Sequence, residues 1–467
     1  MKRRRTCKPF ECDLTLLSKA IKAISDQLNR RQNLKLVAIN SGWLIGDKIL
    51  RMLIGLFVGA WVARYLGPDQ YGKLAYVVAF LAIFQAFSVL GLDSIIVRDI
   101  AQKTAIPNRI LGTALVLRFL ASALCFSAAC FTIYILHPGG DELLLLVMFV
   151  GLGIIFQVAD IVDLWFQSQS QSRRTVTAKA TSYVFVAAVK IGLILKSAPL
   201  WAFAAAQGIE TVVSAIALYI AYKKYSVFEK WEWSLVVAKK MLRQSWPLLL
   251  SSLLIIIYMR SSQLFIKEFV DSSSVGIYSA AQVLSELWYF LPMTITASVA
   301  PVIARKKAEG EIVYIKALQH LFSMMWLISI LISVSIALLS GYLVTALYGE
   351  AYRSSANILS IHIFTLIPVC FGVAQSIWLI NENRSSLAIY QALAGAVSSV
   401  GLNFILIPNY GIIGAAIATV VSQFIQAFAV NALFAPQVLR IQARALVVLV
   451  STIWQTILHI IQKKESK

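Results

Sequence analysis

Charged residues are scarce in this chain. Asp, Glu, Lys and Arg together make up 14% of its 467 residues, whereas 59% of the residues are hydrophobic. The mean hydropathy is +0.76. So few polar groups are not enough to cover the surface of a water-soluble globule of this length. The composition therefore argues against a soluble enzyme.

Residue types that build metal, disulfide and nucleotide sites are also few. The four histidines have no spacing that would bring two of them together on one helix face, and the five cysteines are scattered along the chain. No GxxxxGK[ST] loop is present, so direct drive by ATP bound to this chain is not indicated. The sequence thus predicts no disulfide framework, no metal site and no organic cofactor.

Long apolar runs are abundant instead. Runs of about 20 residues recur along the chain, and this is the length that an α-helix needs to cross the hydrocarbon core of a bilayer. The pattern predicts an all-α integral membrane protein with about twelve transmembrane helices. We expect the spans at residues 37–62, 74–94, 110–136, 142–166, 176–195 and 199–222, and at 246–268, 276–297, 316–340, 356–380, 386–407 and 411–434.

Lys and Arg gather in every second connection between these spans. With the N-terminus inside the cell, 32 of the 42 Lys and Arg residues fall in cytoplasmic segments or at the span ends next to them, and only 5 fall in or next to outer segments. Because cationic loops mark the cytoplasmic side, this bias predicts a multi-pass protein of the cell (inner or plasma) membrane with a cytoplasmic N-terminus. The net charge of +20 then indicates contact with anionic membrane lipid and no binding of nucleic acid.

The two halves of the sequence repeat each other. YLGPDQYG, which ends at Gly72, aligns with FVDSSSVG, which ends at Gly276, at a shift of 204 residues. Further along, pairing Arg173 with Arg384 gives a shift of 211 residues. Because six spans separate the copies, both have the same orientation, and such parallel repeats are related by a pseudo-two-fold axis along the membrane normal. We therefore expect two six-helix lobes that face each other across a central cleft.

The repeat divides the chain into five parts. They are an N-terminal extension at 1–36, an N-terminal lobe at 37–222, a cytoplasmic linker at 223–245, a C-terminal lobe at 246–434 and a C-terminal segment at 435–467.

The three parts outside the lobes carry predictions of their own. The basic extension fits either a short interfacial helix on the inner membrane face or a partly ordered cytoplasmic tail. The linker, with KWEWSLVVAKK, is typical of an amphipathic helix at the inner surface. Residues 443–461 are long enough for a thirteenth span, but crossing would place Lys463 and Lys464 outside. The charge rule therefore favours an interfacial helix there.

Two motifs in this sequence resemble those of a known family. They are LGPDQYG from Leu66 and PNYGIIGAA from Pro408. Both resemble the polysaccharide transporters, the Wzx-type flippases of O-antigen and related lipid-linked oligosaccharides, over about residues 37–434. This family lies within the multidrug/oligosaccharidyl-lipid/polysaccharide superfamily, whose members share the two-lobe fold.

The resemblance implies an activity and partners. The expected activity is transfer of an undecaprenyl-pyrophosphate-linked glycan from the cytoplasmic to the outer leaflet by rocking of the two lobes, for O-antigen, capsule or exopolysaccharide. Polysaccharide polymerases and glycosyltransferases that act on the same lipid carrier are the implied protein partners.

Cations inside the spans are candidate ligands for such a substrate. A charge near mid-bilayer costs a few kcal/mol, so it usually faces a water-filled cavity or a partner. Arg forms bidentate hydrogen bonds with phosphate oxygens, which suits a pyrophosphate. Two of these cations could have a structural role in place of substrate binding. Asp47, four residues earlier, could neutralise Arg51, and Lys190 could extend outward to the membrane interface. The candidate substrate-binding residues are Arg51, Arg260, Arg118, Lys48 and Lys190.

Carboxylates inside the spans are candidates for ion coupling. A carboxylate in a cavity can carry a proton or coordinate Na⁺. Glu210 and Glu286 are the best candidates because each lies near mid-span with no basic residue within four positions, and Asp47 is a third. Each of the two glutamates could instead be a structural ion-pair partner across helices. Whether H⁺ or Na⁺ is the coupling ion stays open.

Two other functions remain as alternatives to the flippase. A cation-coupled drug or toxin antiporter of the same fold would need an acidic or aromatic cavity, and the cations in the spans argue against it. A membrane glycan polymerase or glycosyltransferase usually has a large loop or a carboxylate cluster. Here the outer connections are mostly short and no DxD pair lies on a loop, so we expect no enzyme. The sugar composition and the oligomeric state are not specified by the sequence.

Overall fold

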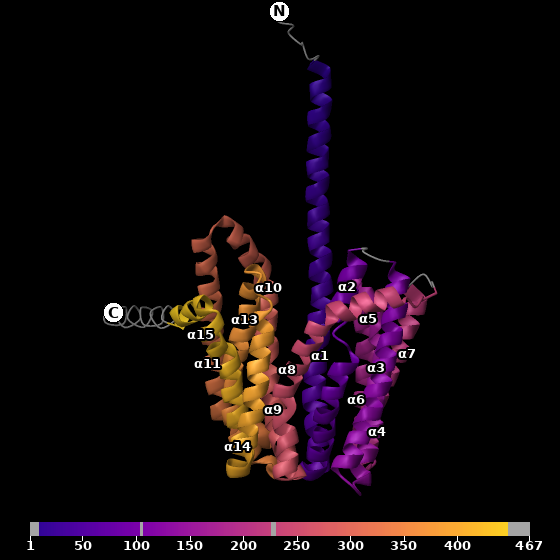
Figure 1. Ribbon diagram of the computed structural model, residues 1–467, viewed down its shortest axis with the longest axis vertical. Coiled ribbons are helices and arrows are strands. Elements are labelled where there is room, and N and C mark those ends of the chain that lie inside the picture. The colour runs from indigo at the N-terminus through magenta and orange to yellow at the C-terminus, as the bar shows by residue number, and fades with distance from the viewer. Residues whose placement is uncertain (1–8, 103–105, 226–229, 447–467) are drawn as a thin grey trace, which may run out of the picture.

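Helices make up the whole of the secondary structure described for this chain (Figure 1). The computed structural model describes the backbone of residues 9–102, 106–225 and 230–446, with side chains from residue 46 onward. In these ranges, ten helical segments are long and apolar enough to cross a membrane. Two of the ten are kinked at a glycine and contain two spans each. This confirms the prediction of an all-α membrane protein with twelve spans.

The N-terminal lobe contains the first six spans. Its elements are α1 (Pro9–Ser88), α2 (Asp93–Ala101), α3 (Pro107–Leu136), α4 (Asp141–Phe156), the 3₁₀ turn η1 (Gln157–Ala159), α5 (Asp160–Ser168), α6 (Ser172–Leu195) and α7 (Leu200–Tyr225).

The C-terminal lobe contains the other six spans. Its elements are α8 (Leu235–Phe269), α9 (Ser272–Glu286), η2 (Leu287–Tyr289), α10 (Phe290–Glu309), α11 (Glu311–Tyr348), η3 (Glu350–Tyr352), α12 (Ser355–His362), η4 (Ile363–Thr365), α13 (Leu366–Asn381), α14 (Leu387–Phe424), the π-helical η5 (Ile425–Ala429) and α15 (Val430–Phe434).

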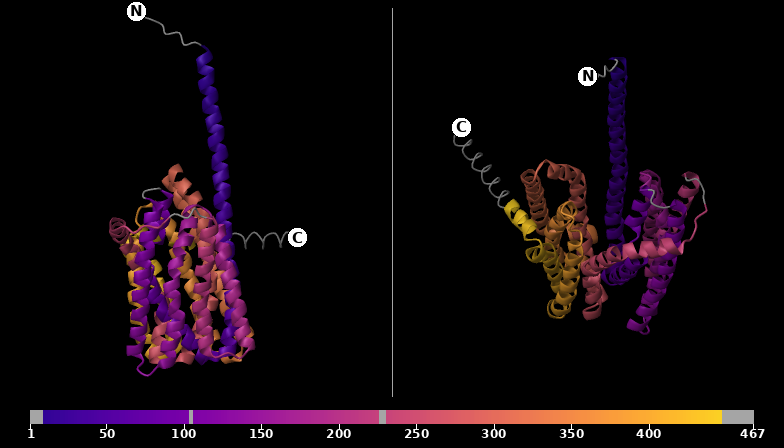
Figure 2. Two further views of the ribbon diagram at one scale, coloured as in Figure 1. Left: turned by 90° about the vertical axis from the view of Figure 1, so that its right-hand side faces the viewer. Right: turned by 45° about the horizontal axis from the view of Figure 1, so that its top comes forward.

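The two family-like motifs lie at helical hairpins. α1 folds back at Gly67, where φ is 73°, and α14 folds back at Gly411, where φ is 57°. A positive φ is open to glycine at little cost, whereas a side chain there would be strained. We call the end of the bundle that carries these two turns the hairpin side. The opposite side, from which α1 projects in Figures 1 and 2, is the predicted cytoplasmic side.

The repeat is visible in the backbone. The 3₁₀ turns η1 and η4, which interrupt the fourth and tenth spans, start 206 residues apart. Ser170 and Asn383 have φ values of 56° and 54°, and each ends the span that precedes it. These two turn residues are 213 positions apart, whereas Arg173 and Arg384 are 211 positions apart. The two halves therefore share the turn conformation, but the two arginines do not occupy equivalent positions relative to it.

The lobes meet through two glycines on the hairpin side. A Cβ atom added to Gly72 would collide with Ser272 O, and one added to Gly276 would collide with Pro68 O. These contacts are reciprocal, because Pro68 and Ser272 are themselves separated by the repeat shift of 204 residues. Reciprocity of this kind is the signature of a two-fold interface. Small residues let helix backbones approach this closely.

Apolar and polar contacts extend this interface. One hydrophobic cluster contains residues of both lobes, among them Ala63 and Ile266. Tyr352 Oη donates a hydrogen bond of 2.8 Å to Ala63 O, and burial raises the pKa of this phenol, so it stays a donor. Tyr76 Oη lies 3.3 Å from a carboxylate oxygen of Glu268 in the other lobe. The lobes are therefore held together at the hairpin side.

The linker is docked on the N-terminal lobe. Glu232 N donates to Asn108 O at 3.1 Å, and Ser234 N donates to Thr113 Oγ1 at 3.1 Å. The prediction of an amphipathic helix is wrong for residues 230–234, which are not helical, because α3 satisfies these backbone donors. α8 begins at Leu235 and continues without a break into the first span of the second lobe.

The structure describes most of the N-terminal extension and little of the C-terminal segment. Residues 9–36 are helical and belong to α1, which projects from the bundle in Figures 1 and 2. Residues 1–8, and nearly all of the segment 443–461 with its possible thirteenth span, lie outside the described residues. What the sequence predicts for these two segments is therefore not tested.

Replacing Gly72 with leucine should separate the lobes at the hairpin side, because the new side chain meets backbone and cannot be accommodated by a rotamer change. Overpacking costs about 1–3 kcal/mol. In a cysteine-free background with Val78→Cys as a reporter inside the bundle, we expect Gly72→Leu to raise labelling by an impermeant maleimide from the hairpin side about tenfold. Gly341→Leu is the control, because no neighbouring atom lies within 4 Å of a Cβ at Gly341. Equal labelling in the two variants would contradict this interface.

Candidate functional site

A central cavity of about 370 Å³ lies between the lobes. The N-terminal lobe lines it with α1, α6 and α7, and the C-terminal lobe lines it with α8 and α9. Most of the lining is apolar, as in ligand pockets generally, where a few polar groups fix the orientation of the ligand. The polar lining includes Tyr183, Lys190, Gln207 and Glu210 of the first lobe, and Arg260, Gln263, Ser279 and Glu286 of the second.

Each lobe contributes one ion pair to this cavity. Lys190 Nζ lies 3.7 Å from Glu210 Oε2, and Arg260 Nη2 lies 3.7 Å from Glu286 Oε2. At this distance the charges attract each other without a direct hydrogen bond. Lys190 also donates to Gln207 Oε1 at 3.2 Å.

Glu286 is held on the other side by an amide. Gln282 Nε2 donates 2.6 Å to Glu286 Oε1, one helical turn away on α9, and 3.2 Å to Met259 O on α8. The carboxylate is thus positioned by its own helix as well as by Arg260.

A second, smaller pocket lies beside the central cavity in the N-terminal lobe. Its volume is about 160 Å³, and its lining includes Arg51, Asp160 and Lys179. Tyr183 and Glu210 line both this pocket and the central cavity. The two spaces are therefore adjacent, with Glu210 at their boundary.

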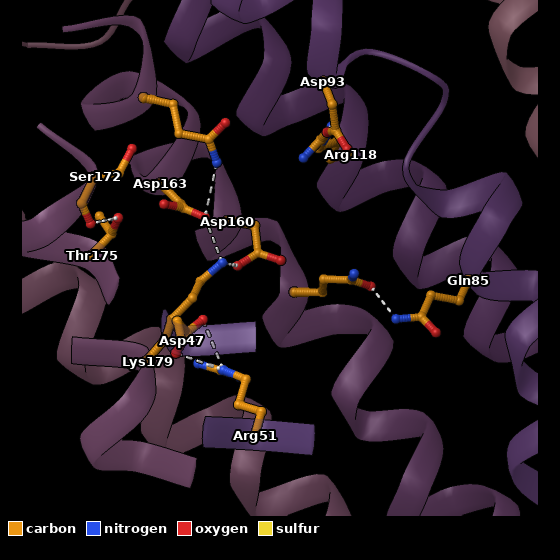
Figure 3. A network of polar contacts seen from close by, with 12 residues as sticks. Asp47, Arg51, Gln85, Asp93, Arg118, Asp160, Asp163, Ser172, Thr175 and Lys179 are labelled. Atoms are coloured by element: carbon orange, nitrogen blue, oxygen red, sulfur yellow. Dashed lines mark hydrogen bonds and ion pairs between the residues drawn. The ribbon is translucent and has the colours of Figure 1, made fainter. Parts of the chain in front are cut away.

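Three residues that line the second pocket, Arg51, Asp160 and Lys179, take part in ion pairs, which Figure 3 shows. Lys179 Nζ lies 2.7 Å from Asp160 Oδ1 and 2.7 Å from Asp163 Oδ2. Arg51 Nε donates 2.9 Å to Asp47 Oδ1, and the guanidinium carbon of Arg51 lies 5.3 Å from the ring centroid of Tyr183. No local pattern in the sequence predicts this network, because Lys179 reaches the two aspartates only after α5 and α6 pack against each other.

The structure brings together some of the predicted site residues. Arg260, Lys190, Glu210 and Glu286 all line the central cavity. Arg51 lines the smaller pocket, so it does not share a cavity with Arg260. The alternative in which Lys190 extends outward to the interface does not hold, since its side chain faces Glu210 inside the lobe.

The other predicted cations lie elsewhere. Arg118 is buried and pairs with Asp93, and neither residue lines the two cavities; Figure 3 shows this pair apart from Asp47 and Arg51. Lys48 is exposed and lines neither cavity. Asp47 is the ion-pair partner of Arg51, which is the structural role considered for this pair from the sequence. Their roles in substrate binding and ion coupling stay predictions.

The charge of the central cavity differs from the expectation of a cationic interior. Its lining holds Lys190 and Arg260 together with Glu210 and Glu286, two charges of each sign. Uncompensated charges are expensive in a low-dielectric interior, and a partner across the helix interface offsets that cost. An anionic ligand must therefore compete with a resident carboxylate for each cation.

Sequence reasoning missed the uncharged polar residues of the cavity wall. Gln263 follows Arg260 by three positions and so lies on the same helix face. That spacing was a usable signal. Ser279 and Gln207 had none, because small hydroxyl and amide residues are frequent inside helical membrane proteins.

Comparisons with known proteins agree with this architecture. The family model described as "Polysaccharide biosynthesis protein" matches residues 37–307. No curated protein matches the chain.

Solved structures with a similar fold exist. The lipid II flippase MurJ in an inward closed conformation superposes with a TM-score of 0.70 at 14% identity, over 90% of this chain and 93% of that one. An inward-facing multidrug resistance MATE family transporter gives 0.67 at 16% identity, over 84% and 96%. An outward-facing one gives 0.62 at 16% identity, over 88% and 96%. At these identities the likeness shows the fold.

Replacing Lys179 with methionine should destabilise the N-terminal lobe, because two carboxylates would lose their shared ammonium. Breaking a fully buried ion pair costs 3–5 kcal/mol, and since the Asp160 side chain is 34% exposed we expect about 2 kcal/mol here. The measurement is the thermal unfolding temperature in detergent. The variant Asp160→Asn/Asp163→Asn/Lys179→Met should recover most of the loss. An unfolding temperature unchanged by Lys179→Met would show that the network does not stabilise the lobe.

Proposed function

This chain belongs to the polysaccharide biosynthesis protein family, and on that premise we propose that it is a flippase for undecaprenyl-pyrophosphate-linked oligosaccharides. The proposed substrate moves from the cytoplasmic to the outer leaflet of the cell membrane and supplies the synthesis of a cell-surface polysaccharide. No covalent bond changes in this activity, so the chain acts as a transporter and not as an enzyme.

The central cavity is the observation that carries this proposal. It lies between two lobes of the fold shared with a lipid II flippase, and it presents Arg260 and Lys190 to a ligand. A pyrophosphate offers several acceptor oxygens, so it can bind Arg260 bidentately and Lys190 as a point charge. Apolar cavity walls raise the strength of such charged hydrogen bonds.

Substrate binding would rearrange the resident ion pairs. The two carboxylate contacts are long, at 3.7 Å each, so phosphate oxygens at hydrogen-bond distance can replace them. Glu210 and Glu286 would then lose their counter-charges. A carboxylate left alone in a cavity takes up a proton or Na⁺, which gives a physical route for coupling substrate binding to a cation gradient.

Alternating access would follow from rocking of the lobes. The close contacts at the hairpin side separate the cavity from the predicted outer face, and loss of the contacts at Gly72 and Gly276 would open it there. In this scheme we expect the N-terminus in the cytoplasm, because cationic segments favour that side of the membrane. Glycosyltransferases would supply the substrate, and a polymerase would use it after transfer.

An antiporter of drugs or toxins is the second candidate. It is favoured by the equal number of acidic and basic side chains in the cavity and by the MATE fold. An organic cation would bind Glu210 or Glu286, whereas a pyrophosphate requires Arg260.

Removing Arg260 separates these candidates. In a strain that lacks the chromosomal gene, we expect Arg260→Ala to leave the lipid-linked glycan on the inner leaflet, as detected by a leaflet-specific assay and mass spectrometry, with transport reduced at least about 100-fold. Arg51→Ala tests the smaller pocket in the same strain. The control is Arg353→Ala, because the Arg353 side chain is 82% exposed.

Three results would decide against the flippase. These are full complementation by Arg260→Ala at normal protein levels, unchanged lipid intermediates in the deletion strain, and altered drug tolerance as the only phenotype.

Neutralising the cavity carboxylates tests the coupling. Glu210→Gln and Glu286→Gln keep the size of each side chain but can no longer exchange a proton or bind Na⁺ with a full charge. If either glutamate couples, transport by that variant into vesicles should no longer respond to an imposed proton or sodium gradient. A response equal to that of the wild type in both variants would assign the two glutamates to ion pairing alone.

A further inference from the structure

Gln263 is a buried amide in the wall of the central cavity. Its relative exposure is 5%, and it lines the cavity together with Arg260 and Ser279. Its Oε1 atom has no hydrogen-bond partner among the residues that the structure describes. A buried acceptor without a partner is costly, so such an atom is a candidate for contact with a ligand.

A neighbour on the adjacent helix pairs with the nitrogen of this amide. Gln263 Nε2 donates a hydrogen bond of 2.7 Å to Ser279 Oγ on α9. The nitrogen therefore faces α9, and the carbonyl oxygen is the group left for another donor. The amide thus holds an acceptor without a partner in the wall of the cavity.

Gln263 lies next to the residue proposed to bind pyrophosphate. Arg260 and Gln263 are three positions apart on α8, so their Cβ atoms are about 5–6 Å from each other on one helix face. In a sugar pyrophosphate, the first hydrogen-bond donor beyond the phosphate is the substituent at C2 of the attached sugar, a hydroxyl or an acetamido N–H. Both groups are donors, which is the polarity that the unpaired Oε1 of Gln263 requires.

We propose that Gln263 recognises the C2 substituent of the sugar attached to the pyrophosphate, by accepting its hydrogen bond at Oε1. The inference rests on the proposed function and deepens it, because it names the part of the glycan that the protein reads. A donor at C2 satisfies the buried carbonyl, whereas a 2-deoxy sugar leaves it unpaired. Sites built around a hydrogen bond reject ligands that lack the partner group.

Binding of short-chain probes to the purified full-length protein tests this inference. The probes are farnesyl-pyrophosphoryl-N-acetylglucosamine, farnesyl-pyrophosphoryl-glucose, farnesyl-pyrophosphoryl-2-deoxyglucose and farnesyl pyrophosphate. For the wild type we expect the two sugars with a C2 donor to bind about three- to tenfold more tightly than the 2-deoxy sugar, the effect of one neutral hydrogen bond.

Two variants show whether Gln263 is responsible. Gln263→Met keeps the length of the side chain and removes the acceptor, so it should abolish the preference for the sugars with a C2 donor over the 2-deoxy sugar. Ser279→Ala removes the partner that orients the amide and should reduce the preference in part. If Gln263→Met does not fold, Ser279→Ala still tests the role of the amide.

The outcomes separate this inference from the proposed function. A wild-type protein that binds all four probes equally, or a preference that survives both variants, would overturn the role of Gln263 and leave the flippase intact. A protein that binds none of the pyrophosphates would contradict the flippase itself.

Discussion

Close backbone contact between α1 and α9, one from each lobe, is the constraint on which this structure depends. Gly72 and Gly276 let the start of the second span and the start of the eighth touch, each against backbone of the opposite lobe. Because the contact is reciprocal, it defines the pseudo-two-fold axis and so the relation of all twelve spans. It also places α1, α8 and α9 side by side. These helices, with α6 and α7, line the central cavity.

Charge in a low-dielectric interior is the second constraint. The N-terminal lobe holds Lys179 between two aspartates, Arg51 against Asp47, and Lys190 beside Glu210. The C-terminal lobe builds equivalent spans with far fewer charges, since η4 is followed by Leu366 where η1 is followed by Asp160. The fold therefore does not require these ion pairs. Buried ionic groups contribute little net stability, and for this reason we propose a role in transport for them.

Much of the architecture was accessible from the sequence, and less of the site. Twelve spans, the parallel repeat and the two glycine turns follow from apolar length and from residues with special backbone freedom, which are local properties. Partners across helices are not local. The pairing of Lys179 with Asp160, and of Glu286 with Arg260, depends on how helices pack and rotate. The same limit explains why Arg51 and Arg260 were expected together and lie in different pockets, and why the acceptor of Gln263 was missed.

The most direct measurement uses the purified protein in liposomes with a fluorescent undecaprenyl-pyrophosphoryl sugar in both leaflets. A membrane-impermeant quencher reaches only the outer leaflet. If the cavity carries this lipid between leaflets, we expect quenching to pass well beyond half of the fluorescence at a rate that rises with the amount of protein, and to stop at half in empty liposomes. Quenching that stops at half with and without the protein would contradict the central claim.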